Sequence, residues 1–73
     1  MRIVVTRSGE KANNGRYDLF EVMNRDTGIF YRVWVGPFTR GEGFVRIKNI
    51  RGGNYIAPHG ALGTAICEAV GAK

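Results

Sequence analysis

The residues that could carry catalytic chemistry in this sequence are few and scattered. The 73 residues include one histidine, His59, one cysteine, Cys67, and six carboxylates without a paired spacing. His59 has no nucleophile beside it for which it could act as a general base, and Cys67 falls next to the apolar stripe of a predicted helix, where an inert thiol is expected. The sequence lacks a pair of zinc ligands and a phosphate-binding glycine motif. We therefore expect no catalytic site, no metal and no cofactor.

The chemistry that remains is that of binding, and the cations supply most of it. Eleven Lys and Arg residues stand against six Asp and Glu residues, which gives a formal net charge of +5 and a pI near 10.0. Eight of these cations are arginines, whose guanidinium groups suit forked contacts with phosphate or carboxylate and stack on aromatic rings. This charge favours acidic partners, so nucleic acid and acidic protein surfaces are the two partner classes that we expect.

One predicted strand carries apolar side chains on both of its faces. In Ile29–Val35 (IFYRVWV), Phe30, Arg32 and Trp34 alternate with four apolar residues. An antiparallel strand that faces water on one side normally pairs an apolar face with a polar one. Two aromatic rings and a guanidinium on the second face therefore predict that this face meets a partner molecule.

A predicted β-hairpin positions this strand. Arg16–Asn24 (RYDLFEVMN) precedes it, and the connection Arg25-Asp26-Thr27-Gly28 ends in a glycine that suits the left-handed position of a type I turn with a bulge. Pairing Asn24 with Ile29 sets the register of the two strands. The expected pairs on one face are Met23 with Phe30, Glu21 with Arg32 and Leu19 with Trp34, while the other face gathers Phe20, Val22, Tyr31, Val33 and Val35.

The uncharged face of this hairpin is the expected core, because burying unpaired charge is costly. On the other face, the pairing of Glu21 with Arg32 has two interpretations. It is either an ordinary cross-strand ion pair, worth about 0.2 to 1 kcal/mol, or part of an interface with a partner.

The remaining strands are predicted from alternation and from turn-forming residues. Gly36-Pro37 is expected to end the third strand, since proline has no amide proton for the ladder. In the fourth strand, Arg46 and Lys48 are expected to point away from the core. The other predicted segments are a first strand at Arg2–Arg7, a polar loop at Ser8–Gly15, a basic loop at Thr39–Gly43, a fourth strand at Phe44–Ile50 and a short edge segment at Tyr55–Ala57.

From Pro58 onward the apolar period becomes helical, with Leu62, Ile66 and Val70 spaced by four and Gly71 placed as a stop. This stripe is expected to pack on the sheet. The sequence thus predicts a single α+β domain over residues 1–73, with a small antiparallel sheet of about four strands and one C-terminal helix packed on it.

Two sets of residues are the candidate binding residues. The aromatic and aliphatic centre with one arginine is typical of protein-binding hot spots, and the basic set is typical of surfaces that meet phosphates or acidic side chains. The protein-binding set is Leu19, Met23, Phe30, Arg32 and Trp34. The basic set is Arg40, Arg46, Lys48 and Arg51, with Arg2, Arg7 and Lys11 as secondary members.

In length and charge the chain resembles the small basic single-domain proteins with which bacteriophages bind host RNA polymerase and redirect transcription. The resemblance implies docking of a monomer on the amino-terminal part of the polymerase β′ subunit, near the RNA exit channel, to inhibit initiation or to promote antitermination. Such a protein works in the host cytoplasm. The amino-terminal apolar run is shorter than a signal peptide and no window is long enough to span a bilayer, so a cytoplasmic location without membrane contact is the expectation.

The alternative function is direct binding of RNA or DNA. On this interpretation, the basic side chains meet phosphates while exposed rings on the same sheet face stack on bases. The two functions are compatible, because a protein seated near emerging RNA can use an apolar patch for docking and a basic edge for RNA.

Overall fold

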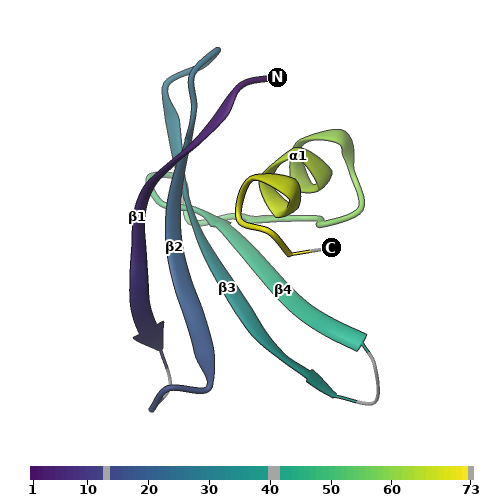
Figure 1. Cartoon of the computed structure of the whole chain (residues 1–73). Coiled ribbons are helices and arrows are strands. Elements are labelled where there is room, and N and C mark those ends of the chain that lie inside the picture. The colour runs from purple at the N-terminus through teal and green to yellow at the C-terminus, as the bar shows by residue number, and fades with distance from the viewer. Residues whose placement is uncertain (13, 40–41, 73) are drawn as a thin grey trace.

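Five antiparallel strands in sequential order form one sheet, and a C-terminal helix packs on one of its faces (Figure 1). The computed structural model describes residues 1–12, 14–39 and 42–72, with side chains described outside 37–44. The α+β class, the sheet of about four strands and the terminal helix are confirmed, and the fifth strand lies in the short edge segment predicted at Tyr55–Ala57. The elements are β1 (Ile3–Ala12), β2 (Tyr17–Asn24), β3 (Ile29–Thr39), β4 (Glu42–Asn49), β5 (Tyr55–Ile56) and α1 (Ala61–Ala69).

The β2–β3 hairpin has the predicted register. Asn24 pairs with Ile29, and each pair further along follows from it, through Met23 with Phe30 to Leu19 with Trp34. The carbonyl of Asn24 accepts hydrogen bonds from the amides of Thr27 and Gly28, and Gly28 has the left-handed backbone (φ 76°) that this turn needs. The turn therefore fixes which side chains share each face of the sheet.

The core lies between the sheet and α1, on the face that the alternation predicts. Val22, Val33, Ile47 and Ile66 have no exposed surface, and Tyr31 is almost fully buried beside them. Other apolar side chains pack around this centre: Ile3, Phe20, Val35, Val45, Ile56, Leu62, Cys67 and Val70. The predicted inward stripe of the helix is confirmed by this packing.

Helix α1 begins at Ala61, three residues after the proline at which the helical pattern starts, with Gly60 as a cap that makes no side-chain hydrogen bond. It ends where the sequence predicts. Gly71 has a left-handed backbone (φ 77°), and the amides of Gly71 and Ala72 donate to the carbonyls of Glu68 and Cys67. These bonds satisfy carbonyl groups that the helix end would otherwise leave unpaired.

The prediction that the first strand ends at Arg7 and that Ser8–Gly15 is a loop was wrong. β1 continues to Ala12, and register shifts between Val5 and Arg7 and between Arg7 and Glu10 absorb the extra residues. Gly9, with a φ of 83°, lies within the second shift. Because β1 is a mostly exposed edge strand, it needs no apolar alternation, and its polar sequence was mistaken for a loop.

The prediction that Gly36-Pro37 ends the third strand was also wrong. β3 continues to Thr39, and the pairing with β4 is shifted between Gly36 and Thr39. Proline is tolerated in a sheet at such irregular positions, because no regular ladder bond is required of it there. β4 begins at Glu42, earlier than the predicted start at Phe44, and Thr39 pairs with Glu42. The basic loop predicted at Thr39–Gly43 is thus mostly strand, apart from residues 40 and 41, which lie outside the described ranges.

The helix approaches the segment before it so closely that only glycine fits at position 63. A Cβ at Gly63 would lie 2.1 Å from the carbonyl oxygen of Ala57 and 2.6 Å from Cα of Pro58. Both of these atoms belong to the backbone and cannot swing aside as a flexible side chain would. Glycine is about 1 kcal/mol less favourable than alanine inside a helix, but at this position it allows the close packing that a Cβ would prevent.

We expect Gly63→Ala to lower the free energy of unfolding by about 1 to 3 kcal/mol, because the clash outweighs the gain in helix propensity. Urea unfolding followed by circular dichroism measures the change. Thr64→Ala is the control, because Thr64 is the next residue of α1, is exposed, and gains helix propensity from the same alanine without adding any atom. Equal stability of the two variants would contradict the steric explanation.

Candidate binding face of the sheet

The face of the sheet opposite the core carries most of the predicted binding residues. Within the described ranges α1 is the single helix, and it packs on the core side, so no described element covers this second face. We call it the outer face. The register places on it Leu19, Glu21 and Met23 of β2, Phe30, Arg32 and Trp34 of β3, Arg46 and Lys48 of β4, and Tyr55 of β5.

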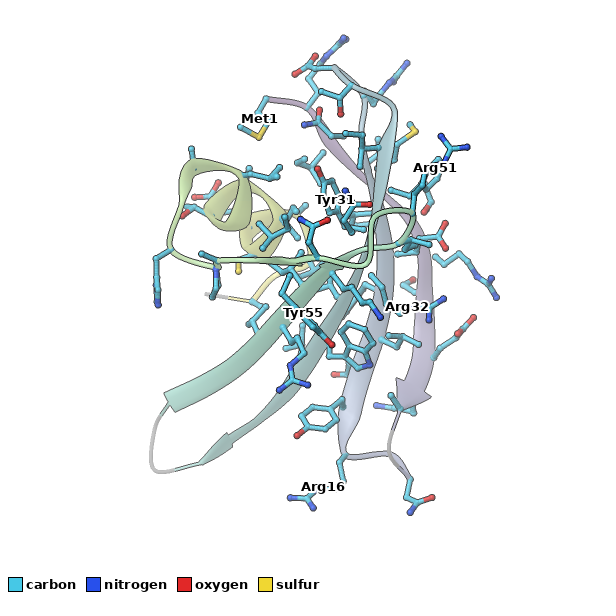
Figure 2. The ribbon with its side chains drawn as sticks, turned by 180° about the vertical axis from the view of Figure 1, so that it is seen from behind. Met1, Arg16, Tyr31, Arg32, Arg51 and Tyr55 are labelled. Carbon is cyan, nitrogen blue, oxygen red and sulfur yellow. The ribbon has the colours of Figure 1, made fainter. Side chains whose placement is uncertain are left out.

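Cations and rings alternate across one half of the outer face, which we call the basic end. Trp34 pairs with Arg46 in the neighbouring strand. Arg32 pairs with Lys48, which in turn pairs with Tyr55. The two predicted sets of binding residues are therefore not on separate surfaces, because Arg46 and Lys48 lie beside Arg32 and Trp34. Figure 2 shows Arg32 and Tyr55 in the middle of the sheet, with Arg51 nearer the end at which Met1 lies.

Tyr55 is a site residue that the sequence reasoning missed. Its side chain is 58% exposed, the most exposed of the aromatic residues whose burial is described. The guanidinium carbon of Arg46 lies 5.5 Å from the centre of the Tyr55 ring, and Nζ of Lys48 lies 5.8 Å from it. These are cation–π distances. The signal that could have found Tyr55 was the glycine turn after β4, which returns the chain beside Lys48.

Asn49 holds the turn that brings Tyr55 to this place. Its side-chain oxygen accepts hydrogen bonds from the amides of Arg51 and Gly52, and its carbonyl accepts one from the amide of Gly53. Its own amide donates to the carbonyl of Asn54. One asparagine thus fixes the path of the chain between β4 and the two residues of β5, which are too few to set their own position.

Of the two interpretations of Glu21 and Arg32, the structure does not show the cross-strand ion pair. The two residues are cross-strand partners, but the Glu21 carboxylate accepts a hydrogen bond from the Thr6 hydroxyl at 3.0 Å, and no salt bridge joins it to Arg32. Arg32 is exposed and, among the residues that the structure describes, pairs with no carboxylate. Its guanidinium group is therefore available to a partner, as the interface interpretation requires.

The other half of the outer face is apolar, and we call it the apolar end. Val4, Met23 and Phe30 are neighbours across β1, β2 and β3, and Phe30 is 40% exposed. The amide of Ile50 donates to the Phe30 carbonyl, so Ile50 lies next to this row. An open hollow of about 750 Å³ lies here, with Phe30, Ile50 and Arg51 among its lining residues.

The secondary basic candidates, which lie in β1 or directly before it, form ion pairs with acidic neighbours. Arg2 pairs with Asp26 at 3.2 Å, Arg7 with Glu10 at 2.6 Å, and Lys11 with Asp18. All six side chains are at least 44% exposed, so these surface pairs add little stability, but each reduces the positive charge offered to a phosphate. Arg40 lies outside the described residues. The structure thus brings together only Arg46 and Lys48 of the basic set, with Arg51 at the apolar end.

The two residues considered for catalysis lie on the helix side of the molecule. His59 and Cys67 both line a hollow of about 340 Å³ with Val45 and Thr64. Burial raises the pKa of the Cys67 thiol, which disfavours the reactive thiolate. In the described part of the chain, no three His, Cys, Asp or Glu side chains gather closely enough to hold a metal ion.

The helix of the described chain is too short, at nine residues, to cross a membrane. Comparisons with protein-family models, with curated proteins and with solved structures found no match to this chain.

The contact between Arg2 and Asp26 lowers the pKa of the Asp26 carboxyl group. The cause is first the hydrogen bond from the Arg2 amide and then the one from its guanidinium group. Because the folded pKa is lower than the unfolded one, the contribution to stability is present above the unfolded pKa. It is lost as the pH falls through the folded pKa.

We expect Arg2→Gln to raise the pKa of Asp26 part of the way to its ordinary value, since the backbone hydrogen bond remains. An NMR titration of the carboxyl carbons measures the shift. Arg25→Gln removes an equal charge from a neighbouring turn residue and serves as the control. An Asp26 pKa that is the same in the wild type and in Arg2→Gln would contradict the assigned cause.

Proposed function

We propose that this chain is a non-enzymatic binding module that binds single-stranded nucleic acid on the basic end of its outer face. The observation that carries the proposal is the placement of Trp34 and Tyr55 among Arg32, Arg46 and Lys48 on an uncovered sheet. Sheets with exposed rings and cations bind single strands by stacking bases on the rings and pairing phosphates with the cations.

The electrostatics of the outer face support this proposal. Arg32, Arg46 and Lys48 are adjacent on β3 and β4, and Glu21 is the carboxylate that the register places on this face of β2. Glu21 is already engaged by the Thr6 hydroxyl. The net charge of +5 adds a long-range attraction for a polyanion. The local and the overall charge thus favour the same class of partner.

A single strand fits this surface better than a duplex does. The bases of a duplex are stacked on one another, and a reader of a duplex needs an element that enters a groove. The rings of the basic end lie on the flat of a sheet, where they can be reached by bases that are already unstacked. The proposed ligand is therefore single-stranded RNA or DNA.

We expect Lys48→Gln to reduce the steepness with which affinity falls as salt rises. Each phosphate contact to a single strand contributes about 0.7 to the slope of log affinity against log salt, so the slope should become shallower by about that amount. Fluorescence anisotropy with a labelled single-stranded oligonucleotide measures it. Arg25→Gln, in the exposed turn after β2, removes the same charge away from the site and should leave the slope unchanged. Equal slopes in both variants would count against a phosphate contact at Lys48.

A second candidate function is the one that the resemblance to phage regulators implies, docking on bacterial RNA polymerase near the RNA exit channel in the host cytoplasm. The observation that favours it is the apolar end, where Phe30 and Ile50 border a hollow with Arg51 at its rim. An exposed aromatic ring, an aliphatic neighbour and an arginine are the combination that protein-binding hot spots favour. Docking through this end would leave the basic end open to emerging RNA.

If the apolar end docks on polymerase, Phe30→Ala should abolish the retention of polymerase subunits on the tagged protein in a nuclease-treated bacterial lysate. Val5→Ala is the matched control, because Val5 is 38% exposed but lies on the core side of β1. Mass spectrometry identifies what remains bound. Retention by Phe30→Ala equal to that of the wild type, or no retention by either, would exclude docking through Phe30.

A further inference from the structure

We propose that Tyr55 is the principal base-stacking residue of the basic end. When a nucleic-acid strand binds, Arg46 and Lys48 leave the Tyr55 ring and contact phosphates of the strand instead. This inference rests on the proposed binding of single-stranded nucleic acid and names the part of the ligand that Tyr55 recognises, the face of an unstacked base. The site it defines consists of Tyr55, Arg46 and Lys48, with Trp34 as a second ring.

The exposure and position of Tyr55 are those of a stacking platform. The side chain is 58% exposed although it lies on a paired strand, so burial in the protein does not account for its aromatic ring. The next residue, Ile56, points to the core and anchors β5 there. The hydrogen bonds of Asn49 fix the turn on the other side of Tyr55. The backbone that carries the ring is thus held in place before any ligand arrives, which lowers the entropic cost of binding.

The two cations beside the ring are placed to bind the phosphates on either side of a stacked base. Arg46 and Lys48 are alternate residues of β4, so their Cα atoms are about 7 Å apart on the same face. Their charges lie 5.5 and 5.8 Å from the ring centre. A base that stacks on Tyr55 brings its own phosphates within reach of these side chains. The weak cation–π contacts are then replaced by charge-assisted hydrogen bonds to phosphate, which are stronger.

Trp34 gives the site a second ring, on which a neighbouring base of the ligand can stack. Arg46 pairs with Trp34 of β3 in the register, and its guanidinium carbon lies 5.5 Å from the centre of the Tyr55 ring, so Arg46 lies between the strands that carry the two rings. Successive bases can therefore stack on β3 and on β5 while the backbone between them passes over β4. Such a path requires bases that are free to separate, as in a single strand.

The test compares ligands that differ only in their bases. The probes are a labelled oligothymidine of about eight nucleotides, an abasic strand with the same number of phosphates, and a duplex of the same length. The proteins are the wild type, Tyr55→Leu and Tyr55→Phe, each checked for native folding by circular dichroism. Tyr55→Phe is the matched control, because it keeps the ring and removes only the hydroxyl group.

We expect oligothymidine to bind the wild type more tightly than either other probe does. Tyr55→Leu should weaken binding of oligothymidine at least about fivefold, leave binding of the abasic strand unweakened, and keep the salt dependence of the wild type. Tyr55→Phe should bind oligothymidine as the wild type does. Equal binding of oligothymidine and the abasic strand, or wild-type affinity in Tyr55→Leu, would overturn the stacking role but not the proposed function. Failure of the wild type to bind any probe would overturn both.

Discussion

The contact between the helix and the segment that precedes it is the constraint on which the rest of the structure depends. Gly63 lets the α1 backbone lie against Ala57 and Pro58, at a distance that no Cβ would permit. This approach seats Ile66 on the sheet, where it shares a fully buried cluster with Val22, Val33 and Ile47. One face of the sheet is thereby closed by a helix of nine residues. No second helix exists in the described chain to close the other face.

The properties of the outer face follow from this one-sided core. Its rings and aliphatic side chains would normally be placed against another layer, and its cations would normally be exposed to water. On this sheet they share one surface, graded from the apolar end at Phe30 to the basic end at Tyr55. A surface of this kind can offer stacking and charge to the same ligand, because no second layer of the described chain covers it. Arg32, which has no acidic partner among the described residues, shows this most clearly.

The sequence allowed the β2–β3 register and both faces of that hairpin to be predicted, because one turn with Gly28 determines every pair after Asn24. It did not allow the length of β1 to be predicted, since an exposed edge strand with register shifts has neither alternation nor apolar content. Tyr55 was missed for a different reason. Its role depends on the turn at Asn49, which brings it beside Lys48. The glycines of this turn indicate that the chain reverses, but they do not show the hydrogen bonds that place Tyr55 opposite Lys48. The pairing of Glu21 with Thr6 instead of Arg32 likewise depends on the shifted register of β1.

The irregular path of β1 also bears on whether another strand can add to this edge of the sheet. An open edge strand is a template on which another strand can add, and a long, flat one invites fibrillar assembly. β1 is long, but its two register shifts interrupt the regular spacing of amides and carbonyls, and Arg7, Glu10 and Lys11 place charges along it. Sheet extension at this edge is therefore discouraged. The molecule thus combines an adhesive face that is exposed to solvent with an edge at β1 that is a poor template for a further strand.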